Sequence, residues 1–153
     1  MPGSYDITFW QNSASIDQAP LISALAAGGA KVRAVVPDLD HPTRRLMGWQ
    51  RPDYGDADLC VAADLAAVRD LAGSARAERA HVFTGLGSSP TVSAAFRTLQ
   101  GRADGHLSVM TESWDPRGVT GALRRARYAG RVLRWGRHVD SLLAIGELAA
   151  AQF

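Results

Sequence analysis

Six short apolar segments recur along the chain, separated by polar loops and by stretches with helical character. The segments are residues 5–10, 31–36, 57–62, 81–84, 106–110 and 141–145. Strands that alternate with helices form a parallel sheet whose two faces the helices cover. We therefore predict an α/β fold: a Rossmann-like, doubly wound parallel sheet of about six strands with right-handed crossovers. A chain of 153 residues suits a single domain of this kind.

Capping residues mark where the helices begin. Asp17 is expected to cap a helix that runs to about Ala27, and Asp64 a helix that runs to about Ser74. Ser89 followed by Pro90 is a strong helix start, because proline is favoured at the first helical position. The other expected helices are residues 118–137, a turn near 43–47, and a last one that opens at residue 147.

The last predicted helix, residues 147–153, stops after about two turns with no termination signal. A helix this short is marginal on its own. We therefore expect the chain to be part of a longer protein.

Two polar loops are the strongest candidates for a binding site. An open parallel sheet binds ligands beyond the carboxyl ends of its strands, where the strand order reverses. In the common order 3-2-1-4-5-6, the loops that follow strands one and four meet at that point. The predicted ligand-binding residues in these loops are Gln11, Asn12, Ser13, Asp17, Gln18, Gly85, Leu86, Gly87 and Ser88. The alternative is that these residues serve only as caps and turns.

The fifth strand leads into a polar segment that faces the same edge of the sheet. Glu112 is the candidate catalytic carboxylate, which would act as a base or hold hydroxyl groups. Ser113 is a further binding candidate, and Trp114 is a candidate for stacking on a sugar ring. The alternative for Glu112 is a solvated loop charge.

Other site classes lack support in the sequence. Gly85-Leu86-Gly87 is followed by Pro90 where the dinucleotide fingerprint requires its third glycine, so NAD binding is not indicated. The histidines and the single cysteine show no metal-ligand spacing, and we expect neither a metal nor a cofactor. The net charge of +2 does not indicate a nucleic-acid partner.

A basic amphipathic helix is predicted between Arg117 and His138, a segment with seven arginines and no acidic residue. An arginine stripe lies beside an apolar face. Its members are Arg124, Arg127, Arg131 and Arg134. Such a helix can rest on an anionic membrane or contact phosphate. The alternative is a solvated face.

The chain resembles a known enzyme class at both ends. The opening, YDITFWQNSASIDQAPLISALAAGGAKVRAVV, resembles that of retaining glycosyltransferases of the GT-B fold, the glycogen-synthase-like superfamily. The fifth strand, the long basic helix and the closing DSLLAIGELAAAQF are similar to the end of the same half. The resemblance implies the N-terminal, acceptor-side domain of a two-domain, metal-independent enzyme. It also implies a nucleotide-sugar donor bound by a C-terminal domain and a glycan or lipid-linked acceptor.

Two positions depart from the family pattern. Many relatives carry a Gly-Gly pair after the first strand, where this chain has Gln11-Asn12-Ser13. Many also use a histidine where Glu112-Ser113 stands. Without the donor-binding half, the chain alone is expected to be inactive.

Two other functions stay open: the half-domain of a nucleotide-sugar epimerase, and a free-standing Rossmann-like binding module. The start of the chain lacks a secretory signal, and no apolar run approaches the roughly 20 residues that span a bilayer. We therefore expect a cytoplasmic protein, with peripheral contact at the inner membrane face if the basic helix binds lipid.

Overall fold

A computed structural model describes residues 5–39, 46–101 and 104–152. Its strands are β1 (Ile7–Trp10), β2 (Val32–Val36), β3 (Asp58–Val61), β4 (Ala80–Thr84), β5 (His106–Glu112) and β6 (Ser141–Ile145). Its helices are α1 (Ala19–Ala27), α3 (Leu65–Ser74), α4 (Pro90–Leu99), α5 (Gly118–Trp135), the short 3₁₀ helix η1 (Gly136–His138) and α6 (Glu147–Gln152). The turn of helix predicted near residues 43–47 falls largely outside the described residues.

The six strands form one all-parallel sheet in the order β3-β2-β1-β4-β5-β6. Strand β1 lies at the centre, with Ile7 paired to Val32 on one side and to Ala80 on the other. The order reverses between β1 and β4, which is the switch point of a doubly wound fold. The predicted α/β, Rossmann-like fold and its strand order are confirmed.

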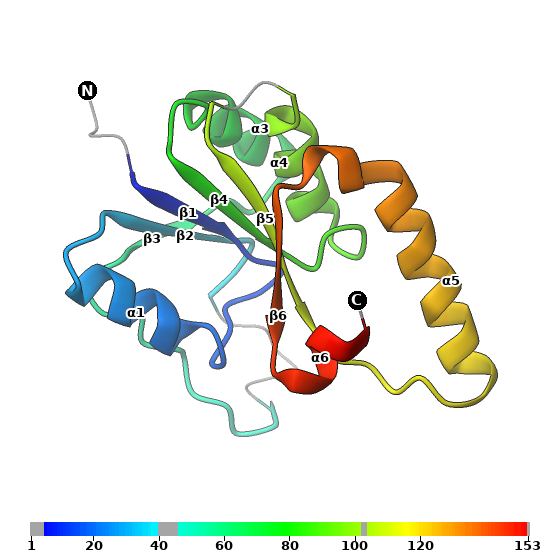
Figure 1. Cartoon of the computed structure of the whole chain (residues 1–153). Helices are drawn as coiled ribbons and strands as arrows, with labels where there is room; N and C mark the ends of the chain where they lie inside the picture. The colour runs from blue at the N-terminus through cyan, green and yellow to red at the C-terminus, as the bar shows by residue number, and fades with distance from the viewer. Residues whose placement is uncertain (1–4, 40–45, 102–103, 153) are drawn as a thin grey trace.

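Helices cover both faces of the sheet (Figure 1). Helix α1 packs on one face, where Ile22 contacts a cluster that includes Phe9 and Val82. Helices α3 and α4 pack on the other face around Trp10 and Phe83. The central strands are buried on both faces, which is why apolar residues predominate in them on both sides of the sheet.

Two of the three predicted helix caps are confirmed. The Asp64 carboxylate accepts a hydrogen bond from the Ala67 backbone N–H at 2.8 Å, and Ser89 Oγ accepts one from the Val92 N–H at 3.4 Å. The cap at Asp17 is wrong, because the residue at the cap position of α1 is Gln18, whose side chain makes no capping bond. Proline in the first turn removes a backbone donor that a cap would otherwise satisfy.

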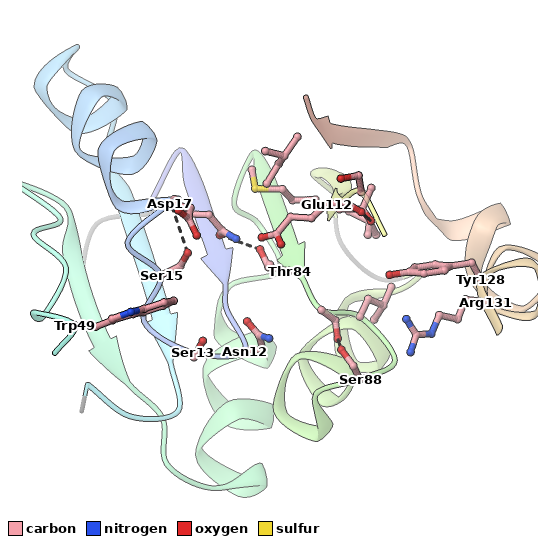
Figure 2. A pocket seen from close by; sticks show the side chains of 18 residues that line it. Asn12, Ser13, Ser15, Asp17, Trp49, Thr84, Ser88, Glu112, Tyr128 and Arg131 are labelled. Atoms are coloured by element: carbon pink, nitrogen blue, oxygen red, sulfur yellow. Dashed lines mark hydrogen bonds between the residues drawn. The ribbon is translucent and has the colours of Figure 1, made fainter. Parts of the chain in front are cut away.

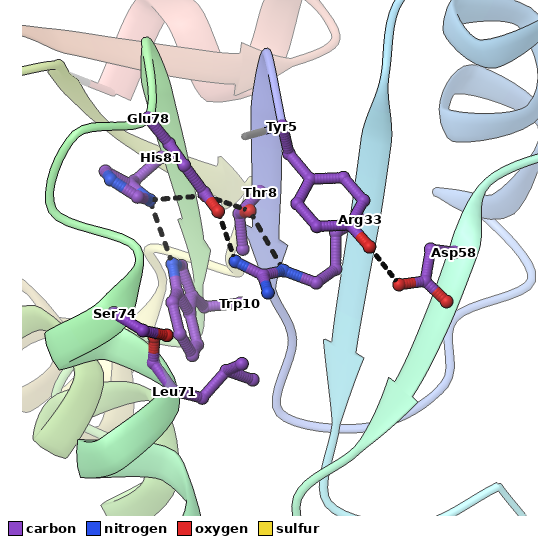
Figure 3. A network of polar contacts seen from close by, with 9 residues as sticks. All are labelled: Tyr5, Thr8, Trp10, Arg33, Asp58, Leu71, Ser74, Glu78 and His81. Atoms are coloured by element: carbon purple, nitrogen blue, oxygen red, sulfur yellow. Dashed lines mark hydrogen bonds and ion pairs between the residues drawn. The ribbon is translucent and has the colours of Figure 1, made fainter. Parts of the chain in front are cut away.

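A polar row crosses the buried sheet at the level of Thr8 (Figure 3). Arg33 and His81 are the register partners of Thr8 on either side. The Arg33 guanidinium forms a buried ion pair with Glu78, which also accepts a hydrogen bond from the Thr8 hydroxyl. Trp10 Nε1 donates to His81 Nδ1 at 3.4 Å. The charged groups are therefore paired inside the domain, as burial requires.

Helix α5 stands at the β6 edge of the domain (Figure 1) and packs lightly against it. Gly121 is its only buried residue. A Cβ at Gly121 would lie 2.1 Å from the Pro116 backbone, so glycine permits this close approach. Among the described residues, no helix combines the length and the apolar character needed to cross a membrane.

Candidate functional site

A hollow of about 420 Å³ opens at the carboxyl ends of the strands, at the switch point (Figure 2). We call it the rim hollow. Its walls are the loops that follow β1, β4 and β5, together with Trp49 and the inner side of α5. The predicted site residues that line it are Asn12, Ser13, Asp17, Gln18, Gly85, Leu86, Ser88, Glu112 and Ser113. The loops that the sequence assigned to one edge of the sheet do meet there.

Gln11 does not line the rim hollow but supports its floor. Its side chain is 2% exposed, and Nε2 donates to Gln18 Oε1 at 2.7 Å while Oε1 accepts from the Tyr54 hydroxyl at 2.6 Å. Thr84 donates to Gln18 Oε1 at 3.0 Å, and the Ser15 backbone N–H donates to the Tyr54 hydroxyl at 3.0 Å. This chain of bonds fixes the β1–α1 loop against β4 and against the connection that carries Tyr54, so we assign Gln11 a positioning role.

The β4–α4 loop is shaped by Gly85, whose φ of +79° favours glycine. A Cβ at this position would lie 3.2 Å from both Asn12 Nδ2 and Ser88 Oγ. Glycine thus lets the loops after β1 and β4 approach closely and brings two polar side chains together.

Gly87 lies outside the residues that line the rim hollow. Its φ is +81°, and its backbone N–H donates to Ser93 Oγ at 3.1 Å. A Cβ there would lie 2.7 Å from the Trp135 ring and 2.8 Å from Arg131 Nε. Gly87 therefore acts indirectly: it allows the loop to pack against α5.

The end of β5 supplies the second carboxylate of the rim hollow. Glu112 is exposed and lines the hollow together with Thr111 and Ser113. Trp114, a candidate for sugar stacking, does not line it; instead its ring stacks on Tyr128 with centroids 4.5 Å apart.

Several residues that line the rim hollow had no binding role in the sequence analysis, and three of these are aromatic or charged: Trp49, Tyr128 and Arg131. Trp49 and Tyr128 stand on opposite sides of the rim hollow (Figure 2). Arg131, which the sequence places in an arginine stripe, also lines the hollow and lies over the Tyr128 ring at 5.2 Å. The spacing Tyr128-x-x-Arg131 puts both residues on one side of a helix, and this spacing could have identified them as a pair from the sequence.

The rest of the arginine stripe does not line the rim hollow. Arg124 and Arg127 are exposed, and the Arg134 guanidinium lies 5.4 Å from the centre of the Trp135 ring. The stripe is thus divided between the site and the outer surface of α5.

The chemistry of the rim hollow combines neutral polar groups with few charges. Amide and hydroxyl groups line its wall, and the charged residues that line it are Asp17, Glu112 and Arg131. Aromatic rings border it on two sides. Within the described part of the chain, no three His, Cys, Asp or Glu side chains are grouped so as to hold a metal ion.

A second hollow of about 340 Å³ adjoins the first, between α5 and the β5–β6 part of the sheet. We call it the apolar groove, because Val132, Trp135, Val139 and Leu142 are among its lining residues. Tyr128 and Arg131 line both cavities. The two spaces therefore lie next to each other at these side chains.

In comparisons with known proteins, no family model matches the chain and no curated protein matches its sequence.

Proposed function

We propose that the rim hollow binds a sugar-bearing acceptor, and that this domain is the acceptor-side half of a glycosyltransferase that uses a nucleotide-sugar donor. The supporting observation is the composition of the hollow: amides, hydroxyls and two carboxylates at the switch point, between two aromatic rings. Sugar hydroxyls both donate and accept hydrogen bonds, and carboxylates and amides match them. Aromatic faces cover the apolar C–H surface of a sugar ring.

Within this proposal the carboxylates hold the acceptor in register. Asp17 and Glu112 accept hydrogen bonds from acceptor hydroxyls, while Asn12 donates and accepts through its amide. A hydroxyl held in a fixed position next to a donor reacts faster than a free one, because its orientation is settled before the reaction. The donor would be bound by a second domain.

The apolar groove favours an acceptor that carries an apolar group beside its sugar. In this arrangement the sugar lies in the rim hollow, the apolar chain lies in the groove, and Arg131 lies where the two meet. A lipid-linked acceptor fits these features better than a free glycan.

Calorimetric titration of the chain with methyl and octyl glycosides, below micelle-forming concentrations, tests the proposal. We expect octyl glycosides to bind more tightly than methyl glycosides. Asn12→Ala and Glu112→Ala should each weaken binding at least tenfold, about 1.4 kcal/mol, and should lower transfer by the same factor in the intact enzyme. Asp70→Ala, an exposed carboxylate change on α3, is the matched control.

Two results would contradict the proposal. The first is a wild-type chain that binds no glycoside at millimolar concentration. The second is binding that Asn12→Ala and Glu112→Ala leave unchanged, because the sugar would then lie elsewhere. Val132→Asp tests the apolar groove alone: it should weaken the binding of octyl glycosides but not of methyl glycosides.

A further inference from the structure

Helix α5 contacts the domain through one narrow side. Gly121, Tyr128 and Trp135 are spaced seven residues apart, so they share one side of the helix. Gly121 is buried and the two aromatic residues are half-buried. These three positions define the side of α5 that faces the sheet.

The opposite side of α5 is apolar and exposed. We call it the outer face; its members are Val119, Ala122, Leu123, Ala126, Ala129, Gly130 and Leu133, all of them exposed. The exposed fractions are 78% at Val119, 62% at Leu123 and 87% at Leu133. In a soluble helix the apolar stripe normally turns toward the core. Here it turns away, which marks an interaction surface.

Positive charge is concentrated beside the outer face. Arg127 and Arg134, seven residues apart, follow one edge of this face, and residues 117–138 carry seven arginines without an acidic side chain. The remaining residues of the chain carry ten basic and 15 acidic side chains, a net charge of −5. The domain is therefore strongly polarised, with its positive end on α5.

We propose that the outer face of α5 docks on an anionic lipid surface. Leu123 and Leu133 would enter the boundary between headgroups and acyl chains, and the flanking arginines would reach the phosphates. The exposed apolar residues run along one side of this 18-residue helix, which is about 27 Å long, so the helix would lie along the membrane plane. A nucleic acid would pair with the arginines but would leave the exposed apolar side chains without a partner, so the lipid surface fits both features. This surface is distinct from the rim hollow, and the inference does not depend on the proposed function.

Co-sedimentation with lipid vesicles tests the inference on the chain as it stands. We expect binding to vesicles of equal parts phosphatidylcholine and phosphatidylglycerol, little binding to pure phosphatidylcholine, and weaker binding as salt is raised. The double variant Leu123→Ser/Leu133→Ser should lose at least tenfold in affinity, and so should Arg127→Gln/Arg134→Gln. Leu21→Ser on α1 and Arg69→Gln on α3 change exposed residues of the same types and should bind like the wild type.

Circular dichroism of every variant checks that the fold is retained, since the substituted residues are exposed. Failure of the wild type to bind anionic vesicles would overturn the inference, and so would equal binding to neutral ones. Equal losses in the α1 and α3 controls would also overturn it. Light scattering tests whether a second copy of the chain occupies the outer face instead. A dimer that Leu133→Ser dissociates, together with no vesicle binding, would assign the outer face to that second copy.

Discussion

His81 should make the stability of the domain fall steeply in mild acid. Its side chain is fully buried in β4, between Trp10 and Phe83, with each ring centroid 6.4 Å from that of the histidine. Burial, the larger cause, and the positive charge of Arg33 together lower the pKa of His81 from 6.5 to about 4, although a hydrogen bond to the Ala75 backbone acts in the opposite direction. The neutral ring is therefore the form that the folded protein keeps.

The difference between the pKa of His81 in the folded and the unfolded protein sets the sign and the size of the effect. The folded-state pKa lies below the unfolded-state value, so the unfolded chain binds a proton at higher pH than the folded one. The stability that neutral His81 contributes is fully present above pH 6.5 and is lost as the pH falls toward 4. A shift of about 2.5 units corresponds to about 3 kcal/mol in total, of which about 2 kcal/mol is lost between pH 7 and pH 4.5.

Urea unfolding at pH 7 and pH 4.5 measures this loss. Carboxylate titration contributes to the loss of stability in both the wild type and a variant without the imidazole. The difference between the two losses therefore isolates the contribution of the histidine. We expect His81→Gln to lose about 2 kcal/mol less than the wild type over this range. His106→Gln, which removes a histidine whose side chain is 52% exposed, is the control and should behave like the wild type. Equal pH dependence in His81→Gln and the wild type would refute the reasoning, as would a His81 ring that titrates near pH 6.5 by NMR in the folded protein.

Three further predictions concern the core and the site. Glu78→Gln leaves the Arg33 guanidinium buried without its counter-charge and should lower the free energy of unfolding by about 3–5 kcal/mol in urea titrations. Gly87→Ala forces a Cβ against the Trp135 ring. It should lower the free energy of unfolding by about 1–3 kcal/mol and weaken glycoside binding; unchanged stability would contradict the packing described for this loop. Trp49→Ala removes an exposed ring at the rim hollow and should weaken glycoside binding about fivefold, about 1 kcal/mol, with the melting temperature unchanged; equal affinity would exclude Trp49 from the site.

Much of the fold follows from local patterns. The central strands are short, apolar and buried on both faces, so their runs are visible without any knowledge of the partners. Ser89-Pro90 and Asp64 mark helix starts through bonds to residues only three positions away. Asp17 failed as a cap because Gln18 occupies the cap position, and a shift of one residue at a helix end is not encoded strongly.

The site was less predictable because it depends on the directions of side chains. Gln11 and Asn12 are neighbours of similar chemistry, yet one is buried beneath the hollow and the other lines it, as expected for successive residues at the end of a strand. Trp49 comes from a long connection whose path the sequence does not indicate. Arg131 belongs to an arginine stripe by sequence, and only the packing of α5 turns it toward the site.

The proposed function requires sugar recognition at the carboxyl edge of the sheet, and an NMR titration of the isotope-labelled chain with an octyl glycoside tests this most directly. We predict that amide signals shift in residues 12–18, 84–88 and 111–113. Shifts confined to the opposite edge, at residues 28–31 and 104–106, would contradict the account, and so would a spectrum that does not change.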